Sequence, residues 1–143
     1  MTNLTIAPGI VEELELTAAG RHPEEACALL LGNHGPSHID IRAVAVSANV
    51  TSEDKCIAFE VDSAVYLRVQ KAARAGGPAV VGVWHSHPNG RAEPSEIDCS
   101  RSVEGGWVWL ITAVSAGKCS TRAFQADTID PHQLKNVTIC SDD

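Results

Sequence analysis

Two histidines separated by a single residue stand at the end of an apolar run. His85 and His87 follow residues 79–84, whose continuous apolar character predicts a strand buried on both faces. Side chains two positions apart in a strand point to the same face, so the two imidazoles can converge on one point. A catalytic zinc site combines three protein ligands with an open position for water. Two interpretations stay open for the pair: metal ligands, or two ordinary polar side chains at a strand end, which is the commoner case for an isolated pair.

A carboxylate that could complete such a site follows the histidines. Asp98 comes eleven residues after His87, in the first turn of a helix expected over residues 95–103. The loop between them contains one glycine and two prolines, which favours a tight return over the metal. The spacing of Ser95 and Asp98 is also typical of a helix cap, in which Ser95 accepts a hydrogen bond from a backbone amide. Both interpretations can hold, because a cap fixes the helix that aims Asp98.

Hydrolysis of an amide also needs a group that moves a proton from water to the leaving nitrogen. A carboxylate suits this task, and Glu25 is the first candidate because it immediately precedes the apolar run of residues 26–31. Glu24 is the second candidate. The alternative for either residue is a solvated position in a loop.

The hydrophobic pattern predicts alternating strands and helices, and therefore an α/β fold. Helices are expected over about residues 8–20, 62–75, 95–103 and 131–134. Strands are expected at residues 4–7, 26–31, 39–50, 56–61, 79–84, 107–114, 119–126 and 137–140. Because no internal repeat or linker interrupts the pattern, we expect one domain over residues 1–143, with a core at about residues 3–126 and a tail at 127–143.

The composition argues against several classes of partner. The 143 residues include 11 Lys and Arg against 18 Asp and Glu, a formal charge of −7 that disfavours nucleic acid. Three Trp, one Tyr and two Phe are too few for a base-stacking platform or a membrane belt. The five cysteines contain no CxxC pair, and the first residues contain no basic leader, so we expect a cytoplasmic protein without a membrane partner.

Taken together, the polar residues match a compound pattern. His85, His87, Ser95 and Asp98 resemble the H-x-H-x7-S-x2-D signature of the JAMM, or MPN-plus, metallopeptidases, in a compact prokaryotic form. The upstream segment EACALLLG, which begins at Glu25, is similar to that family's E-x-C-G-x-L-x-G strand. It has Ala28 where the family commonly has glycine. The resemblance extends from the first expected helix to about residue 126.

The resemblance implies a role for each matched residue. It implies that His85, His87 and Asp98 bind one catalytic Zn²⁺, that Glu25 is the general acid and base, and that Ser95 stabilises the tetrahedral oxyanion. The implied fold is a cytidine-deaminase-like α/β sandwich with a mixed central sheet flanked by helices. Deaminase chemistry itself is disfavoured, because no P-C-x-x-C ligand pair follows a histidine here.

The resemblance also implies a substrate class. Compact prokaryotic JAMM proteins act on ubiquitin-like sulfur carriers, so we expect hydrolysis of a peptide or isopeptide bond after the carrier's C-terminal Gly-Gly. Residues 56–60 are the expected edge strand for this tail, and an interior strand is the alternative. A non-catalytic MPN scaffold and a RadC-like protein, whose H-x-H-P-x-G loop is similar to residues 85–90, are the alternative functions. The identity of the carrier and the oligomeric state stay open.

Overall fold

A single mixed sheet organises the computed structural model, which describes residues 2–140. The strand order is β7-β6-β5-β4-β2-β3-β1-β8. The strands are β1 (Asn3–Ile6), β2 (Cys27–His34), β3 (His38–Ser47), β4 (Ala79–His87), β5 (Val108–Ser115), β6 (Lys118–Ala126), β7 (Leu134–Val137) and β8 (Ile139–Cys140). The β4–β5, β1–β3 and β1–β8 pairs are parallel, and the others are antiparallel. The predicted mixed sheet is confirmed.

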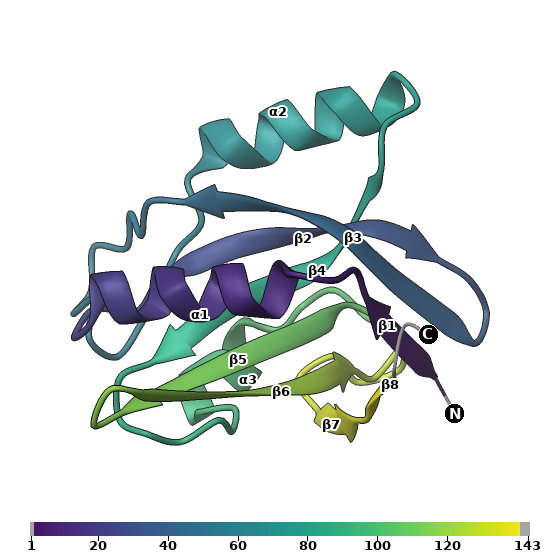
Figure 1. The fold of residues 1–143 in the computed structure, drawn as a ribbon. Coiled ribbons are helices and arrows are strands. Elements are labelled where there is room, and N and C mark those ends of the chain that lie inside the picture. The colour runs from purple at the N-terminus through teal and green to yellow at the C-terminus, as the bar shows by residue number, and fades with distance from the viewer. Residues whose placement is uncertain (1, 141–143) are drawn as a thin grey trace.

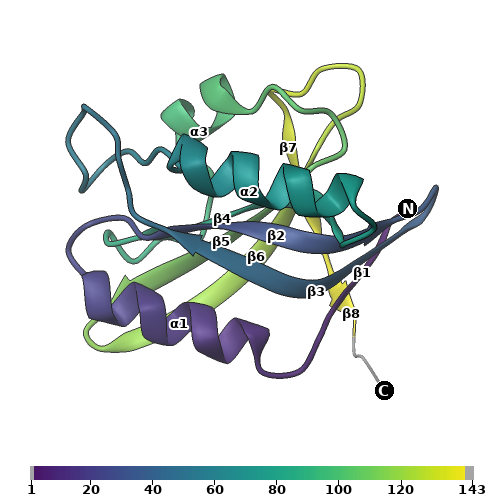
Figure 2. The same ribbon diagram turned by 90° about the horizontal axis from the view of Figure 1, so that it is seen from above.

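Helices cover both faces of this sheet. Helix α1 (Ile10–Arg21) packs on one face, while α2 (Ser63–Arg74) and α3 (Glu96–Arg101) lie on the other (Figures 1 and 2). The helix predicted over about residues 62–75 is confirmed as α2, and the Asp62 carboxylate caps it by accepting a hydrogen bond from the Ala64 amide at 2.9 Å. The layers therefore form the expected α/β sandwich. Within residues 2–140, no helix combines the length and the apolar character needed to cross a bilayer.

The alternation of side chains along β4 separates the core from the site. Trp84 points into the α1 side of the sheet, where it is fully buried among residues such as Leu14 and Leu110. Val83, His85 and His87 consequently face α2 and α3. A Cβ at Gly82 would collide with the backbone of Val108, so glycine at this position lets β4 and β5 pair closely.

The sheet curls until its two edges meet. Strands β7 and β8 lie at opposite ends of the strand order, yet only Thr138 separates them in the chain. β7 pairs with β6 and β8 pairs with β1, so the chain passes from one edge to the other (Figure 1). Val137 and Ile139 both pack against the core on the α1 side. Residues 134–140 thus join the two edges of the sheet.

The predicted strand at residues 56–61 is wrong. Residues 55–57 form a turn, and the segment makes only an isolated bridge between Asn49 and Val61. Its backbone groups bond instead to the loop around them, since Glu60 donates its amide proton to the Asn49 side chain at 3.0 Å. The expected edge strand for a substrate tail is therefore absent.

The predicted helix at residues 131–134 is also wrong. Leu134 begins β7 and pairs with Ala126. The Asp127 carboxylate accepts hydrogen bonds from the amides of Ile129 and Asp130, at 3.1 and 2.9 Å. This side chain closes a turn that returns the chain to the sheet. The apolar pattern of so short a segment fits a helix and a strand equally well.

Candidate metal centre

Three side chains from two elements converge at the end of β4. The Nε2 atoms of His85 and His87 lie 2.9 Å apart, and the Asp98 Oδ2 atom lies 3.1 Å from the first and 3.0 Å from the second. All three side chains are buried. Tetrahedral ligands with bonds of about 2.0 Å lie about 3.3 Å apart. The donor types and their spacing therefore fit a divalent metal ion.

The tautomer of His87 is set by a carbonyl outside the cluster. Its Nδ1–H donates a hydrogen bond to the Arg91 carbonyl at 2.8 Å, which leaves the Nε2 lone pair directed at His85 and Asp98. A backbone carbonyl on the second nitrogen is the usual way in which proteins orient a metal-binding histidine. The loop after β4 thus prepares His87 as a ligand.

His85 is held by aromatic rings. Its imidazole stacks on Phe59, with ring centroids 4.4 Å apart and planes 17° apart, and meets Trp109 edge-on at 5.7 Å. The side chain is fully buried, and its Nδ1 atom has no hydrogen-bond partner among the described residues. Burial lowers the pKa of His85, so the imidazole is neutral, as a metal ligand must be.

Asp98 is positioned by the first turn of α3. Ser95 Oγ accepts a hydrogen bond from the Asp98 amide at 3.1 Å, and Asp98 Oδ2 accepts one from the Ser95 amide at 2.9 Å. This reciprocal capping box confirms the predicted cap. Burial disfavours the charged carboxylate, but the two histidines and the Ser95 amide outweigh it and hold the pKa of Asp98 well below its usual range.

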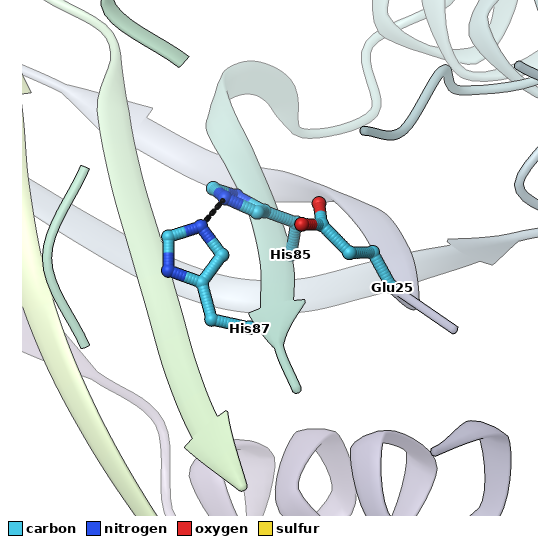
Figure 3. A group of neighbouring side chains, drawn as sticks. All are labelled: Glu25, His85 and His87. Carbon is cyan, nitrogen blue, oxygen red and sulfur yellow. Dashed lines mark hydrogen bonds between the residues drawn. The ribbon is translucent and has the colours of Figure 1, made fainter. Parts of the chain in front are cut away.

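Glu25 lies beside the two histidines. Its carboxylate and the nitrogen donors of His85 and His87 all lie within 4.8 Å of one another, and Figure 3 shows the side chain directed at His85. Burial raises the pKa of Glu25 to about 8, and its Oε1 atom has no partner among the described residues. The neighbouring Glu24 is exposed. Of the two candidate carboxylates, only Glu25 therefore reaches the site.

A hydroxyl links the start of β2 to the end of β4. Ser86 Oγ accepts a hydrogen bond from the Ala26 amide at 2.8 Å, and the Ser86 amide donates to the Ala26 carbonyl at 3.0 Å. Ser86 is buried and lies between the two histidines in sequence. It joins the residue after Glu25 to the strand that carries the histidines.

An apolar groove continues from the cluster along the sheet face. Its volume is about 310 Å³, and its lining includes Val83 beside His85 on β4, and Phe59, which stacks on His85. Four of the six aromatic residues of the chain line it: Phe59, Tyr66, Trp107 and Trp109. A larger cavity of about 500 Å³ includes His34 and Gly106 in its lining, at the opposite end of β2 and β5. The groove, rather than this cavity, adjoins the site.

The residues that sequence reasoning missed act across long sequence separations. Phe59 and Trp109 enclose His85, and Asn49 and Arg101 fasten the loop that carries Phe59. No spacing rule links these positions to the histidines. The sequence indicates only that the polar residues 51–55, after the strand expected at 39–50, form a loop. It does not indicate what that loop contacts.

A helix-flanked mixed sheet with a buried donor cluster at the end of a central strand defines the class: an α/β sandwich suited to holding a metal ion. The chain belongs to the family described as prokaryotic homologs of the JAB domain, whose model matches residues 9–127. This confirms the resemblance to the JAMM family.

Individual relatives agree with this placement. A desampylase from Haloferax volcanii is 34% identical over 97 residues, and the match covers 66% of each chain, just under two thirds. A Salinibacter ruber protein of known structure has a TM-score of 0.72 at 28% identity, over 97% of this chain and 92% of that one. A JAB1/MPN domain protein from Archaeoglobus fulgidus, 18% identical over 98% of both chains, shares the fold with a TM-score of 0.62.

Proposed function

We propose that this protein is a zinc-dependent hydrolase of peptide or isopeptide bonds. It cleaves after the C-terminal Gly-Gly of a ubiquitin-like or sulfur-carrier protein. The observation that carries the proposal is the convergence of His85, His87 and Asp98, with the buried carboxyl of Glu25 beside the two histidines. Kinship with a protein named desampylase supports a hydrolytic deconjugase. A cytoplasmic location and a single domain are parts of the same proposal.

Each residue of the site has a distinct task in this reaction. His85, His87 and Asp98 hold the ion; when bound, Zn²⁺ supplies a Lewis acid that polarises the scissile carbonyl and lowers the pKa of water. Glu25 accepts the proton of the attacking water and delivers it to the leaving amine. In the metal-free protein, burial raises the pKa of Glu25 to about 8, so its carboxyl binds a proton more readily than that of an exposed glutamate, as suits a group that takes up and then delivers a proton.

Ser95 completes the set as the donor to the developing oxyanion. Its Oγ atom accepts the hydrogen bond of the α3 cap, so its own proton is free to be donated. The hydroxyl is only partly buried and stands beside Asp98. A hydrogen bond to the oxyanion is stronger than one to the ground-state carbonyl, so it lowers the barrier.

The groove beside His85 supports the substrate class. An extended tail can lie along it, with an apolar side chain against Trp107 and Trp109, while glycines at the cleavage point permit close approach of the backbone. This groove, instead of an edge strand at residues 56–60, is the proposed binding site of the substrate tail. The complete set of ligands and the buried Glu25 favour a hydrolase over a non-catalytic scaffold.

The test uses zinc-loaded protein and ubiquitin-like carriers extended beyond Gly-Gly, either by a linear peptide or by an isopeptide to lysine. Intact-mass measurement should show a carrier that ends in Gly-Gly, together with the released extension. A carrier with alanine as its last residue before the scissile bond should react more slowly. Capture of carriers without any cleavage would contradict the proposal and favour the scaffold.

A further inference from the structure

We propose that Asn49 is a positioning residue for Glu25, fixing the backbone that delivers this carboxylate to the site. The inference rests on the proposed function, in which Glu25 moves the proton. Asn49 lies just after β3, in the loop that runs over residues 48–62. Its side chain is only partly buried, and none of its four hydrogen bonds goes to a histidine or to Asp98.

The amide of Asn49 uses its full hydrogen-bonding capacity. Its Nδ2 atom donates to the carbonyls of Glu25 and Ala58, each at 3.0 Å. Its Oδ1 atom accepts from the amides of Thr51 and Glu60, at 3.2 and 3.0 Å. Two donors and two acceptor positions are all that an asparagine amide offers. The four partners also fix which side of the amide carries the oxygen.

Glu25 depends on these bonds because it lies outside the sheet ladder. Strand β2 begins at Cys27, so the sheet does not provide partners for the backbone of residue 25. The Glu25 amide donates to the Lys55 carbonyl at 2.7 Å, and its carbonyl accepts from Asn49. Both backbone groups of Glu25 are thus held by the loop over residues 48–62, whose two ends Asn49 joins.

The far side of the same loop is fastened to the metal-site helix. Arg101 of α3 donates to the Phe59 carbonyl at 3.0 Å and pairs with the Glu53 carboxylate at 2.6 Å. Because α3 also carries Asp98, the loop over residues 48–62 connects Glu25 to the helix that bears Asp98. Asn49 supplies the side-chain contact to the Glu25 backbone, beside the main-chain contact from Lys55, so its loss should move the carboxylate and leave the ligands in place.

Two variants separate positioning from stability. Asn49→Asp keeps the shape of the side chain but replaces two donors by acceptors that face carbonyls; Asn49→Ala removes all four bonds. Both should keep one Zn²⁺ per chain, and any rise in KM should be smaller than the fall in kcat, because Arg101 still holds the Phe59 carbonyl at the groove. We expect kcat to fall about 10- to 100-fold, the cost of a misplaced catalytic group. The matched control is Asn33→Asp at the exposed far end of β2, which should leave kcat unchanged.

A second measurement does not depend on turnover. Hydrogen exchange of the Glu25 amide should accelerate at least about tenfold in both variants, while the amides of β4 keep their protection. Unchanged exchange and unchanged kcat would overturn the proposal. Loss of zinc or of cooperative unfolding in both variants would also overturn it, by making Asn49 a general element of the fold. If wild-type protein cleaves no carrier, the proposed function fails, and the exchange of the Glu25 amide still decides the role of Asn49.

Discussion

Among the single residues of the site, one buried environment shifts the pKa values of ionisable groups in opposite directions. Burial opposes charge on Glu25, His85, His87 and Asp98 alike. For His87, the Asp98 carboxylate and the Arg91 carbonyl overcome burial and raise the pKa. Asp98 has two imidazoles and an amide as partners and stays ionised, whereas Glu25 lacks comparable partners and its pKa rises. The partners thus distinguish the carboxylate proposed as a metal ligand from the one proposed to transfer a proton.

The raised pKa of Glu25 predicts a pH-dependent stability of the metal-free protein. Because the folded pKa of about 8 exceeds the unfolded value of 4.5, unfolding favours release of the proton, and the Glu25 contribution to stability falls as pH rises between these values. Glu25→Gln removes the free-energy cost of burying a carboxyl that is ionised in the unfolded chain. Its free energy of unfolding should exceed that of wild type by roughly 2–4 kcal/mol at pH 8, since one pKa unit corresponds to about 1.4 kcal/mol. The difference should shrink toward pH 5.

Urea denaturation of chelator-treated protein at both pH values measures this difference. The matched control is Glu24→Gln, because the neighbouring side chain is exposed and its removal should change stability equally little at pH 5 and pH 8. A Glu25→Gln protein no more stable than wild type at pH 8 would mean that the carboxyl is hydrated or paired in solution.

Four of the five proposed site residues lie at spacings that encode local geometry, whereas Glu25 is indicated only by its place before a buried strand and by the family resemblance. A two-residue interval on a strand directs His85 and His87 to one face, and the cap spacing of Ser95 aims Asp98. Asn49 and Phe59 could not be predicted in this way. Their roles arise from contacts with Glu25 and His85 that only the folded chain creates.

At the scale of elements, burial decided which predictions were right. Continuous apolar runs identified β2 and β4, because strands covered on both faces need apolar side chains throughout. The segments at residues 56–61 and 131–134 are not continuously buried, and hydrogen bonds accepted by the Asn49 and Asp127 side chains override their weak apolar patterns. β4 also extends further than expected, so that both histidines stand within the strand and inherit its rigidity.

The arrangement of elements around the groove predicts an effect on substrate binding. Trp107 precedes β5 and lines the groove, so Trp107→Ala removes apolar surface that the substrate tail would cover. We expect KM for an extended carrier to rise about 5- to 30-fold, equivalent to about 1–2 kcal/mol of lost apolar contact. The value of kcat should change little, because Trp107 is not part of the donor cluster.

Steady-state kinetics on the extended carrier provide the measurement. Ile129→Ala is the control, since this side chain is 92% exposed and lies outside the groove lining. A fall in kcat at constant KM for Trp107→Ala would show that the groove supports the site itself and does not hold the tail.

In the whole molecule, the contacts that close the sheet and the donor cluster lie at opposite ends of the strands. The chain between β7 and β8 joins the two edges of the sheet at one end, and the donor cluster lies at the other end, where β4 finishes. α1 covers the main core, while α2 and α3 leave the groove open beside the cluster. The apolar pattern predicted an α/β fold and the family resemblance implied the layered sandwich, but the meeting of β7 and β8 depends on a long-range pairing that no local pattern contains.

In the proposed site, His85, His87 and Asp98 hold the metal while Glu25 moves the proton. Measuring bound zinc and turnover together in Glu25→Gln and His87→Ala separates these two roles. Glu25→Gln should retain one Zn²⁺ per chain and lose at least about a hundredfold in kcat. His87→Ala should lose both the metal and turnover. Loss of zinc from Glu25→Gln, or full activity in either variant, would contradict this assignment.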